Sequence, residues 1–119
     1  MQVQLRTDNH IEGKQDLARK TEEIVVAALE KFGTRITRVE VHLSDENSHK
    51  ERGDDKRCVM EARPAGHQPV AVNHVADTLE HAIIGAAEKL ERLLDSTLGR
   101  LSDHKGRTSF SGDLSGDEA

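Results

Sequence analysis

Three cations of the C-terminal half have the spacing that phosphate contacts along one helix would need. Lys89, Arg92 and Arg100 are separated by three and eight residues, so they return to nearly the same side of an α-helix, with Ser96 between them. Cations aligned on one helix edge are suited to binding the backbone phosphates of a nucleic acid. The same row is also typical of a solvated helix face, because Glu88 stands four residues before Arg92.

A second set of four arginines lies in segments where apolar and polar residues alternate. Because successive side chains of a strand point to opposite faces, such residues share the polar face of a sheet. The set is Arg6, Arg38, Arg57 and Arg63. Two interpretations remain open: a surface for RNA phosphates, or an ordinary charged sheet face with Arg and Glu pairs across strands.

Catalytic and metal chemistry have little support in the sequence. None of the seven histidines lies three or four residues from another, so no paired ligand motif exists. Cys58, the only cysteine, is predicted to face the core, where a thiol is inert. Loops of the GxSxG, Walker and GxGxxG types are absent. We therefore expect no enzyme activity, metal, cofactor or small-molecule substrate.

The overall composition limits the kinds of partner. A net charge of −5 argues against a general polyanion binder, so any nucleic-acid contact must be local. Phe32 and Phe110 are the only aromatic residues, which excludes base stacking on an aromatic sheet. The first residues have no apolar signal region, and no segment is long and apolar enough to span a bilayer. We expect a cytoplasmic protein without membrane contact.

Hydrophobic periodicity predicts the elements that must position these cations. Two-residue alternation predicts four strands, and apolar residues every three or four positions predict two helices. The strands are expected at residues 1–7, 36–43, 56–63 and 70–72, and the helices at residues 16–32 and 78–101. Gly33 is expected to cap the first helix at its C-terminus, and Asp77 or Thr78 to cap the second at its N-terminus.

The element order predicts an α+β fold, β-α-β-β-β-α. Two amphipathic helices need one apolar sheet face, so both are expected on the same side of a four-stranded sheet. Residues 44–55 contain no apolar side chain and are expected to form a mobile hairpin loop. We expect one domain, residues 1–101, followed by a disordered acidic tail rich in Gly and Ser at residues 102–119.

The segment IIGAAEKLERLL, residues 83–94, following Asp77 and Ala82, resembles the second-helix signature of the ribosome hibernation-promoting factor and ribosome-associated inhibitor family. The opening strand, the polar turn after it and the TRVEVHLS strand also stand where that family has them. The resemblance covers about residues 1–101. Three positions depart from the pattern: Ser96 replaces a frequent lysine, Glu80 a tyrosine and Ile84 an acidic residue.

The resemblance implies a short family member that binds the small ribosomal subunit, at 16S rRNA in the mRNA and tRNA channel. Such a protein inhibits translation or protects idle ribosomes under stress and in stationary phase. Lys89 and Arg92 match basic positions of the family's helix, and Arg100 falls on another. We expect a monomer. The alternative is a divergent module for protein binding that keeps the scaffold without the ribosome.

Overall fold

The computed structural model describes residues 1–8, 14–45 and 56–106. Its elements follow the predicted order β-α-β-β-β-α, with a short 3-10 helix, η1, after the first helix. They are β1 (Gln2–Thr7), α1 (Lys14–Leu29), η1 (Glu30–Arg35), β2 (Ile36–Asp45), β3 (Lys56–Pro64), β4 (Val70–Ala76) and α2 (Leu79–Gly106). The predicted α+β fold class is therefore confirmed.

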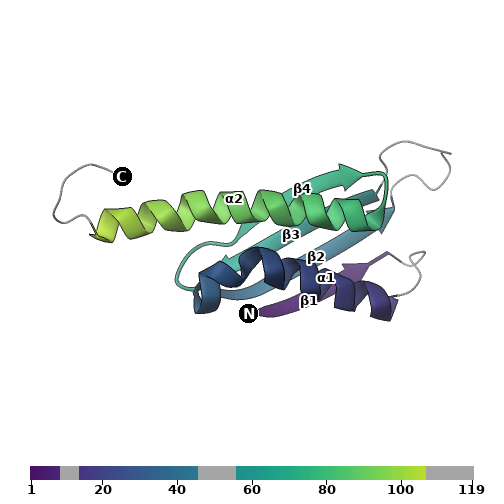
Figure 1. The fold of residues 1–119 in the computed structure, drawn as a ribbon, viewed down its shortest axis with the longest axis horizontal. Helices are drawn as coiled ribbons and strands as arrows, with labels where there is room; N and C mark the ends of the chain where they lie inside the picture. The colour runs from purple at the N-terminus through teal and green to yellow at the C-terminus, as the bar shows by residue number, and fades with distance from the viewer. Residues whose placement is uncertain (9–13, 46–55, 107–119) are drawn as a thin grey trace.

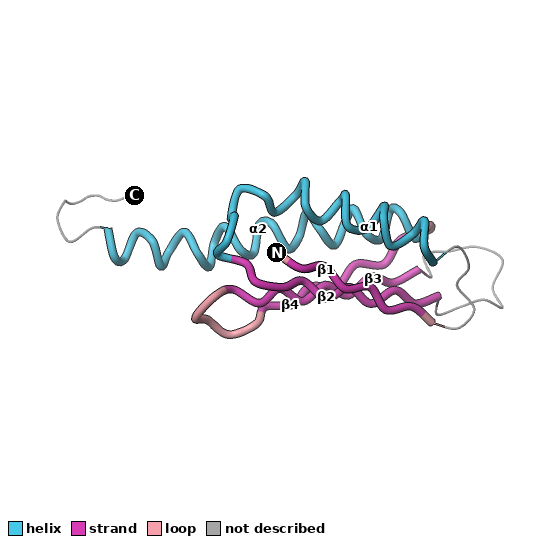
Figure 2. Tube along the Cα trace, turned by 90° about the horizontal axis from the view of Figure 1, so that it is seen from below, coloured by secondary structure: helices cyan, strands magenta, loops and turns pink. Residues whose placement is uncertain are grey.

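The four strands form one mixed sheet in the order β1-β2-β3-β4. β1 pairs with β2 in parallel, while the β2–β3 and β3–β4 pairs are antiparallel. Figure 2 shows both helices on one side of this sheet, as two amphipathic helices require. α2 packs on β3 and β4, and α1 packs beside it on β1 (Figure 1). Within the described residues the opposite sheet face carries no helix, and we call it the open face.

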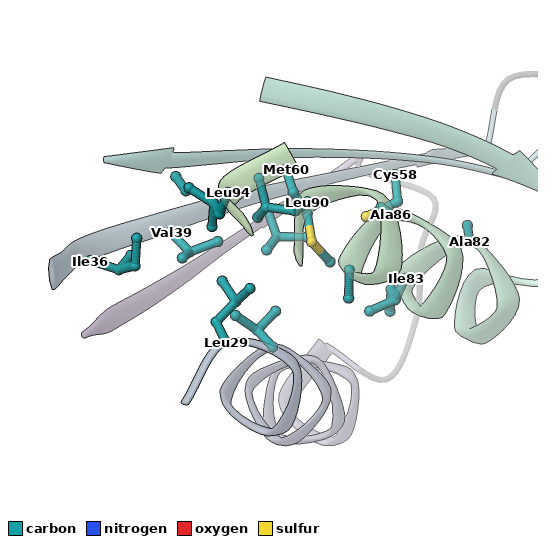
Figure 3. Packing of buried hydrophobic residues seen from close by; sticks show 14 of the residues in the cluster. Leu29, Ile36, Val39, Cys58, Met60, Ala82, Ile83, Ala86, Leu90 and Leu94 are labelled. Carbon is teal, nitrogen blue, oxygen red and sulfur yellow. The ribbon is translucent and has the colours of Figure 1, made fainter. Parts of the chain in front are cut away.

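The core lies between the sheet and the helices. β2 contributes Val39, Val41 and Leu43, and alternate residues of β3 point the same way, as the alternation predicted. Figure 3 shows Met60 of β3 beside Leu90 of α2, and Cys58 beside Ala86. Apart from Phe32, the core of the described residues is aliphatic or sulfur-containing. Its contents are Val25, Leu29, Phe32, Ile36, Val39, Val41, Leu43, Cys58, Met60, Ala62, Ala76, Ala82, Ile83, Ala86, Ala87, Leu90, Leu94 and Leu98.

The first helix ends differently from the prediction of one helix to Phe32. α1 stops at Leu29, and the chain continues as η1 to Arg35. Gly33 has φ 56° and ψ −132°, a conformation that glycine adopts without the strain a Cβ would bring. This kink redirects the chain so that Phe32 is buried and Ile36 begins β2.

Two strands are longer than predicted. β4 was expected at residues 70–72 but continues to Ala76. The alternation of inward and outward side chains persists to Ala76, but the inward residue His74 is polar, so the sequence pattern did not reveal it. β2 runs to Asp45, two residues into the predicted hairpin loop, and these residues pair with Lys56 and Arg57. The rest of the predicted loop, residues 46–55, lies outside the described residues.

α2 begins where predicted and ends later. The Thr78 hydroxyl accepts a hydrogen bond from the His81 backbone N–H at 3.0 Å, so Thr78 is the N-cap. The helix runs to Gly106 and not to Leu101, so residues 102–106, expected in the tail, are helical. No proline interrupts that segment. The remaining tail, residues 107–119, lies outside the described part of the chain. Neither helix has a stretch apolar enough to span a membrane within the described residues.

Candidate nucleic-acid interface

The strand register aligns like charges on the open face. Arg38 of β2 lies opposite Arg63 of β3, and the next outward row places Glu40 opposite Glu61. The ion pairs consequently run along the strands and not between them: Arg38 pairs with Glu40 at 2.5 Å. In β3, Arg63 approaches Glu61 at 3.6 Å. The alternative of pairs across strands is therefore not what the register produces.

These four side chains, Arg38, Glu40, Glu61 and Arg63, form what we call the charge quartet. Each like-charged neighbour across the strands is offset by an opposite charge two residues along the same strand. The quartet has no net charge, and each of its guanidinium groups already lies within ion-pair distance of a carboxylate. Two of the arginines predicted to contact RNA are thus compensated within the protein.

The other half of the open face has a different charge pattern. Arg6 is exposed and lies beside His42 in the β1–β2 register, and His42 approaches Asp8 at 3.6 Å. Within the described segments, Arg6 has no ion pair. Arg57 lies opposite Ser44 on the same face, is half-buried and engages in interactions of its own. Arg6 is therefore the predicted sheet arginine most available to a phosphate.

The predicted helix cations, Lys89, Arg92 and Arg100, belong to α2, and Lys89 lies on the flank of this helix that adjoins β4. Lys89 donates a hydrogen bond from Nζ to the Asn73 backbone oxygen of β4 at 3.0 Å. Arg92, one turn further along, is exposed. Among the residues described by the structure it has no ion pair, and the expected pair with Glu88 is absent. Arg100 lies in α2, but its side chain is outside the described part of the structure.

The opposite flank of α2 is acidic and is tied to α1. Lys20 of α1 approaches Glu80 at 3.5 Å. Lys31 of η1 lies 2.7 Å from Asp95 and 3.1 Å from Glu91. Hydrogen bonds to Asp95 and then Glu91 raise the pKa of Lys31 above its usual value. α2 therefore shows carboxylates toward α1 and cations toward the edge of β4.

The structure brings Lys89 and Arg92 together but separates them from Arg6 by the thickness of the sheet. α2 lies on the covered side of the sheet (Figure 2). The four sheet arginines alternate with the inward residues of their strands and so belong to the open face. The cations thus form two groups that point away from each other. A single flat RNA surface cannot contact both groups.

Sequence reasoning missed Arg35, at the end of η1. Its guanidinium donates a hydrogen bond to the Leu98 backbone oxygen of α2 at 3.3 Å, and the residue is exposed. No carboxylate pairs with it within the described residues. Neither strand alternation nor helical spacing marks a residue in the connection between α1 and β2. Only the packing of η1 against α2 identifies it as a further available cation.

Catalytic groups do not converge at this surface. Burial raises the pKa of the Cys58 thiol to about 12, so the reactive thiolate is strongly disfavoured. Over the described ranges, no three metal-binding side chains cluster. What the arrangement can do is bind anions, through Arg6 and Arg35 and through the Lys89 and Arg92 flank.

Comparisons with known proteins agree with this architecture. No curated protein matches the chain. The N-terminal domain of Protein Y from Thermus thermophilus is similar, with a TM-score of 0.64 and 18% identity over 82% of this chain and 99% of that chain. A ribosomal subunit interface protein from Coxiella burnetii gives a TM-score of 0.66 and 14% identity over 83% of this chain and 99% of that one. At these identities the likeness shows the fold.

The family relationship comes from the sequence itself. A family model described as sigma 54 modulation protein / S30EA ribosomal protein matches residues 4–102, which include most of β1, all of β2, β3 and β4, and most of α2. The match confirms the resemblance carried by residues 83–94. The chain belongs to the sigma 54 modulation protein / S30EA ribosomal protein family.

Proposed function

We propose that this protein binds the ribosome at 16S rRNA of the small subunit, in the channel used by mRNA and tRNA. Occupying that channel would inhibit translation or protect idle ribosomes under stress, without chemistry or a cofactor. Family membership over residues 4–102 is the observation that carries the proposal. The ribosomal subunit interface protein of Coxiella burnetii has a similar fold. The proposal places the protein in the cytoplasm as a monomer.

The distribution of cations supports a channel over a flat surface. Arg6 on the open face and Arg92 on the α2 flank point to different sides of the domain. RNA can contact both only if it surrounds the domain, as the walls of a channel do. The net charge of −5 then matters less, because phosphates near each cation group respond mainly to local charge within about a Debye length of roughly 10 Å.

The charge quartet divides the predicted contacts into two classes. Arg38 and Arg63 must give up carboxylate partners, or share them, before they can bind a phosphate. Arg6, Lys89 and Arg92 have no carboxylate partner among the described residues. We assign the primary phosphate contacts to these three, with Arg100 and Arg57 as further contacts. Arg38 and Arg63 remain secondary.

Cosedimentation with purified ribosomal subunits tests the proposal. The full chain should sediment with 30S particles and not with 50S particles, and binding should weaken as salt rises. Changing Lys89 and Arg92 together to Gln should weaken binding and reduce the slope of log K against log salt by about one per lost contact. Unchanged binding would contradict the assignment, and absence of 30S binding by the wild type would contradict the proposed function.

A matched control changes Lys20 and Lys31 to Gln. This pair also removes two positive charges, but both lysines are already paired with carboxylates of α2. Their ion pairs are exposed to solvent and therefore contribute little to stability. The control should therefore bind 30S particles nearly as well as the wild type, with an unchanged salt slope. Equal losses in both variants would indicate an effect of net charge alone.

The neutral quartet also favours the alternative, a module that binds protein and has lost the ribosome. In that case the wild type would fail to sediment with either subunit at low salt. The two functions are therefore separated by the same experiment.

A further inference from the structure

The outer face of α1 has an apolar centre that none of the other described elements covers. The buried side of α1 is formed by Thr21, Val25 and Leu29, each at most 1% exposed. On the opposite side Val26 is 38% exposed, and Ala27 beside it is also exposed. Figure 2 shows α1 in the outer layer, with the sheet on its other side. A single exposed apolar side chain is common on protein surfaces, so the shape and charge around Val26 decide whether this face is a contact site.

Val26 does lie in a hollow, a shallow depression of about 500 Å³. Its lining follows one face of the helix, with steps of three and four residues. The lining residues are Arg19, Glu22, Glu23, Val26, Ala27 and Glu30. We call this depression the α1 groove. It is separate from the cation groups described above, which lie on the open face and on the β4 side of α2.

The charges around the α1 groove select its occupant. Glu22, Glu23 and Glu30 have no ion pair among the described residues. Arg19, the one cation of the lining, is neutralised by Asp16 at 2.9 Å. The remaining local charge is three uncompensated carboxylates, which repel RNA and anionic lipid and attract cations.

Neighbouring lysines do not offset these carboxylates, because they point to α2. Lys20 pairs with Glu80, and Lys31 pairs with Glu91 and Asp95. Both cations are held on the flank of α1 that faces the second helix. The outer face of α1 therefore keeps its negative charge although lysines adjoin it in sequence.

The spacing along α1 gives the shape of the complementary segment. Glu22, Val26 and Glu30 follow each other at four-residue steps, with Glu30 as the first residue of η1. At about 1.5 Å per residue, the backbones of the two glutamates are about 12 Å apart along the helix axis, with the valine between them. A matching partner has two basic side chains about that far apart and one apolar side chain midway. A helix with Lys or Arg at positions i and i+8 and Leu at i+4 has this pattern.

We propose that the α1 groove docks a lysine- and arginine-rich segment of another protein, which places one apolar side chain against Val26 and pairs its cations with Glu22, Glu23 and Glu30. This site is independent of the RNA contacts and extends beyond the proposed function. The domain would then have an RNA-binding side and a protein-binding side. The partner is a basic protein segment and not a nucleic acid.

The test uses a synthetic helical peptide, alanine-rich, with two lysines eight residues apart and one leucine midway. Titrated into the ¹⁵N-labelled full chain, it should shift the backbone amides of residues 19–30 most. Changing both Glu22 and Glu30 to Gln should weaken binding roughly five- to tenfold, as expected for two exposed ion pairs. Changing Val26 to Ser should also weaken it. Raising salt should reduce binding.

Two controls make the outcome decisive. Glu88, an exposed carboxylate of α2 without an ion pair in the described residues, is changed to Gln and should leave peptide binding unchanged. A peptide with glutamates in place of the lysines should not bind. Shifts centred elsewhere, or binding unaffected by the double Gln change, would overturn the proposal. Shifts of residues 19–30 when the free protein is diluted would also overturn it, since the occupant would then be a second copy.

Discussion

The imidazole of His74 on β4 occupies the space where a side chain at Gly85 on α2 would lie. A Cβ placed on Gly85 would be 2.2 Å from His74 Cδ2 and 2.7 Å from its Cγ. Because Cγ is fixed close to the backbone, the ring cannot avoid the new carbon by a small shift. His74 continues the inward row of β4 after Val72, so this contact sets how closely α2 approaches the edge strand.

The first prediction concerns Gly85→Ala. In an exposed helix this change stabilises by about 1 kcal/mol, because glycine is the poorer helix former. Here the overpacking against His74 costs roughly 1–3 kcal/mol, so we expect a net loss of stability. Chemical denaturation of the two proteins measures the difference in the free energy of unfolding.

Two comparisons isolate the His74 contact. Gly99→Ala, also in α2 but with nothing within 4 Å of the added carbon, should stabilise the protein. In a His74→Ala background, Gly85→Ala should likewise stabilise, because the ring has been removed. If Gly85→Ala stabilised the protein with His74 present, the close packing of ring and helix would be wrong.

The second prediction concerns the reactivity of Cys58. Burial raises its pKa to about 12, against an ordinary value of 9.0, so the thiolate is scarce near neutral pH. In the native protein, a thiol reagent such as a disulfide dye should react about a hundredfold or more slower than in the unfolded chain. Absorbance kinetics with and without denaturant measure the ratio. Similar rates would mean that Cys58 is accessible.

The inward placement of Cys58 belongs to the part of the fold that sequence periodicity predicts well. Apolar residues alternate through residues 36–43 and 56–63, so only one choice of inward face buries their apolar side chains. The structure places them as expected. The length of β4 was underestimated because His74 occupies an inward position that usually holds an apolar residue. Its polar side chain is accommodated only because Gly85 leaves room on α2.

The candidate site was less predictable than the fold. Alternation correctly put Arg38 and Arg63 on the same face, but it could not show that they lie directly opposite each other. That depends on the register between β2 and β3, which the sequence pattern leaves free by steps of two residues. The pairing of both arginines with glutamates of their own strands follows from this register. Arg35 was missed because its position depends on tertiary packing against Leu98.

The third prediction separates compensated from available arginines on the open face. Changing Arg38 and Glu40 together to Gln removes an ion pair without changing the net charge. We expect 30S binding and its salt slope to stay close to wild type. Arg6→Gln removes one cation without an ion pair among the described residues, so the slope should fall by about one.

Salt-dependent cosedimentation of the two variants provides the measurement. A loss of binding from the Arg38 and Glu40 change as large as that from Arg6→Gln would show that the quartet opens and donates its arginines to RNA. The proposed ranking, with Arg6 as a primary phosphate contact and Arg38 as a secondary one, would then be wrong.

The last prediction concerns the pH dependence of the start of α2, where His81 Nδ1 lies 2.8 Å from Asp77 Oδ1. The hydrogen bond to Asp77, and then its negative charge, raises the pKa of His81 above the ordinary 6.5. The same hydrogen bond lowers the pKa of Asp77 below the ordinary 3.8.

The raised histidine pKa adds stability that is complete below 6.5 and is lost as pH rises through the folded value. The lowered Asp77 pKa adds stability that is complete above 3.8 and is lost as pH falls through its folded value. The pair therefore contributes fully between those two ordinary values, and its stabilising effect should disappear on either side. NMR titration of the His81 ring should give a pKa above 6.5 in the wild type and a lower one in Asp77→Asn. An unchanged His81 titration in Asp77→Asn would mean that the contact does not hold in solution.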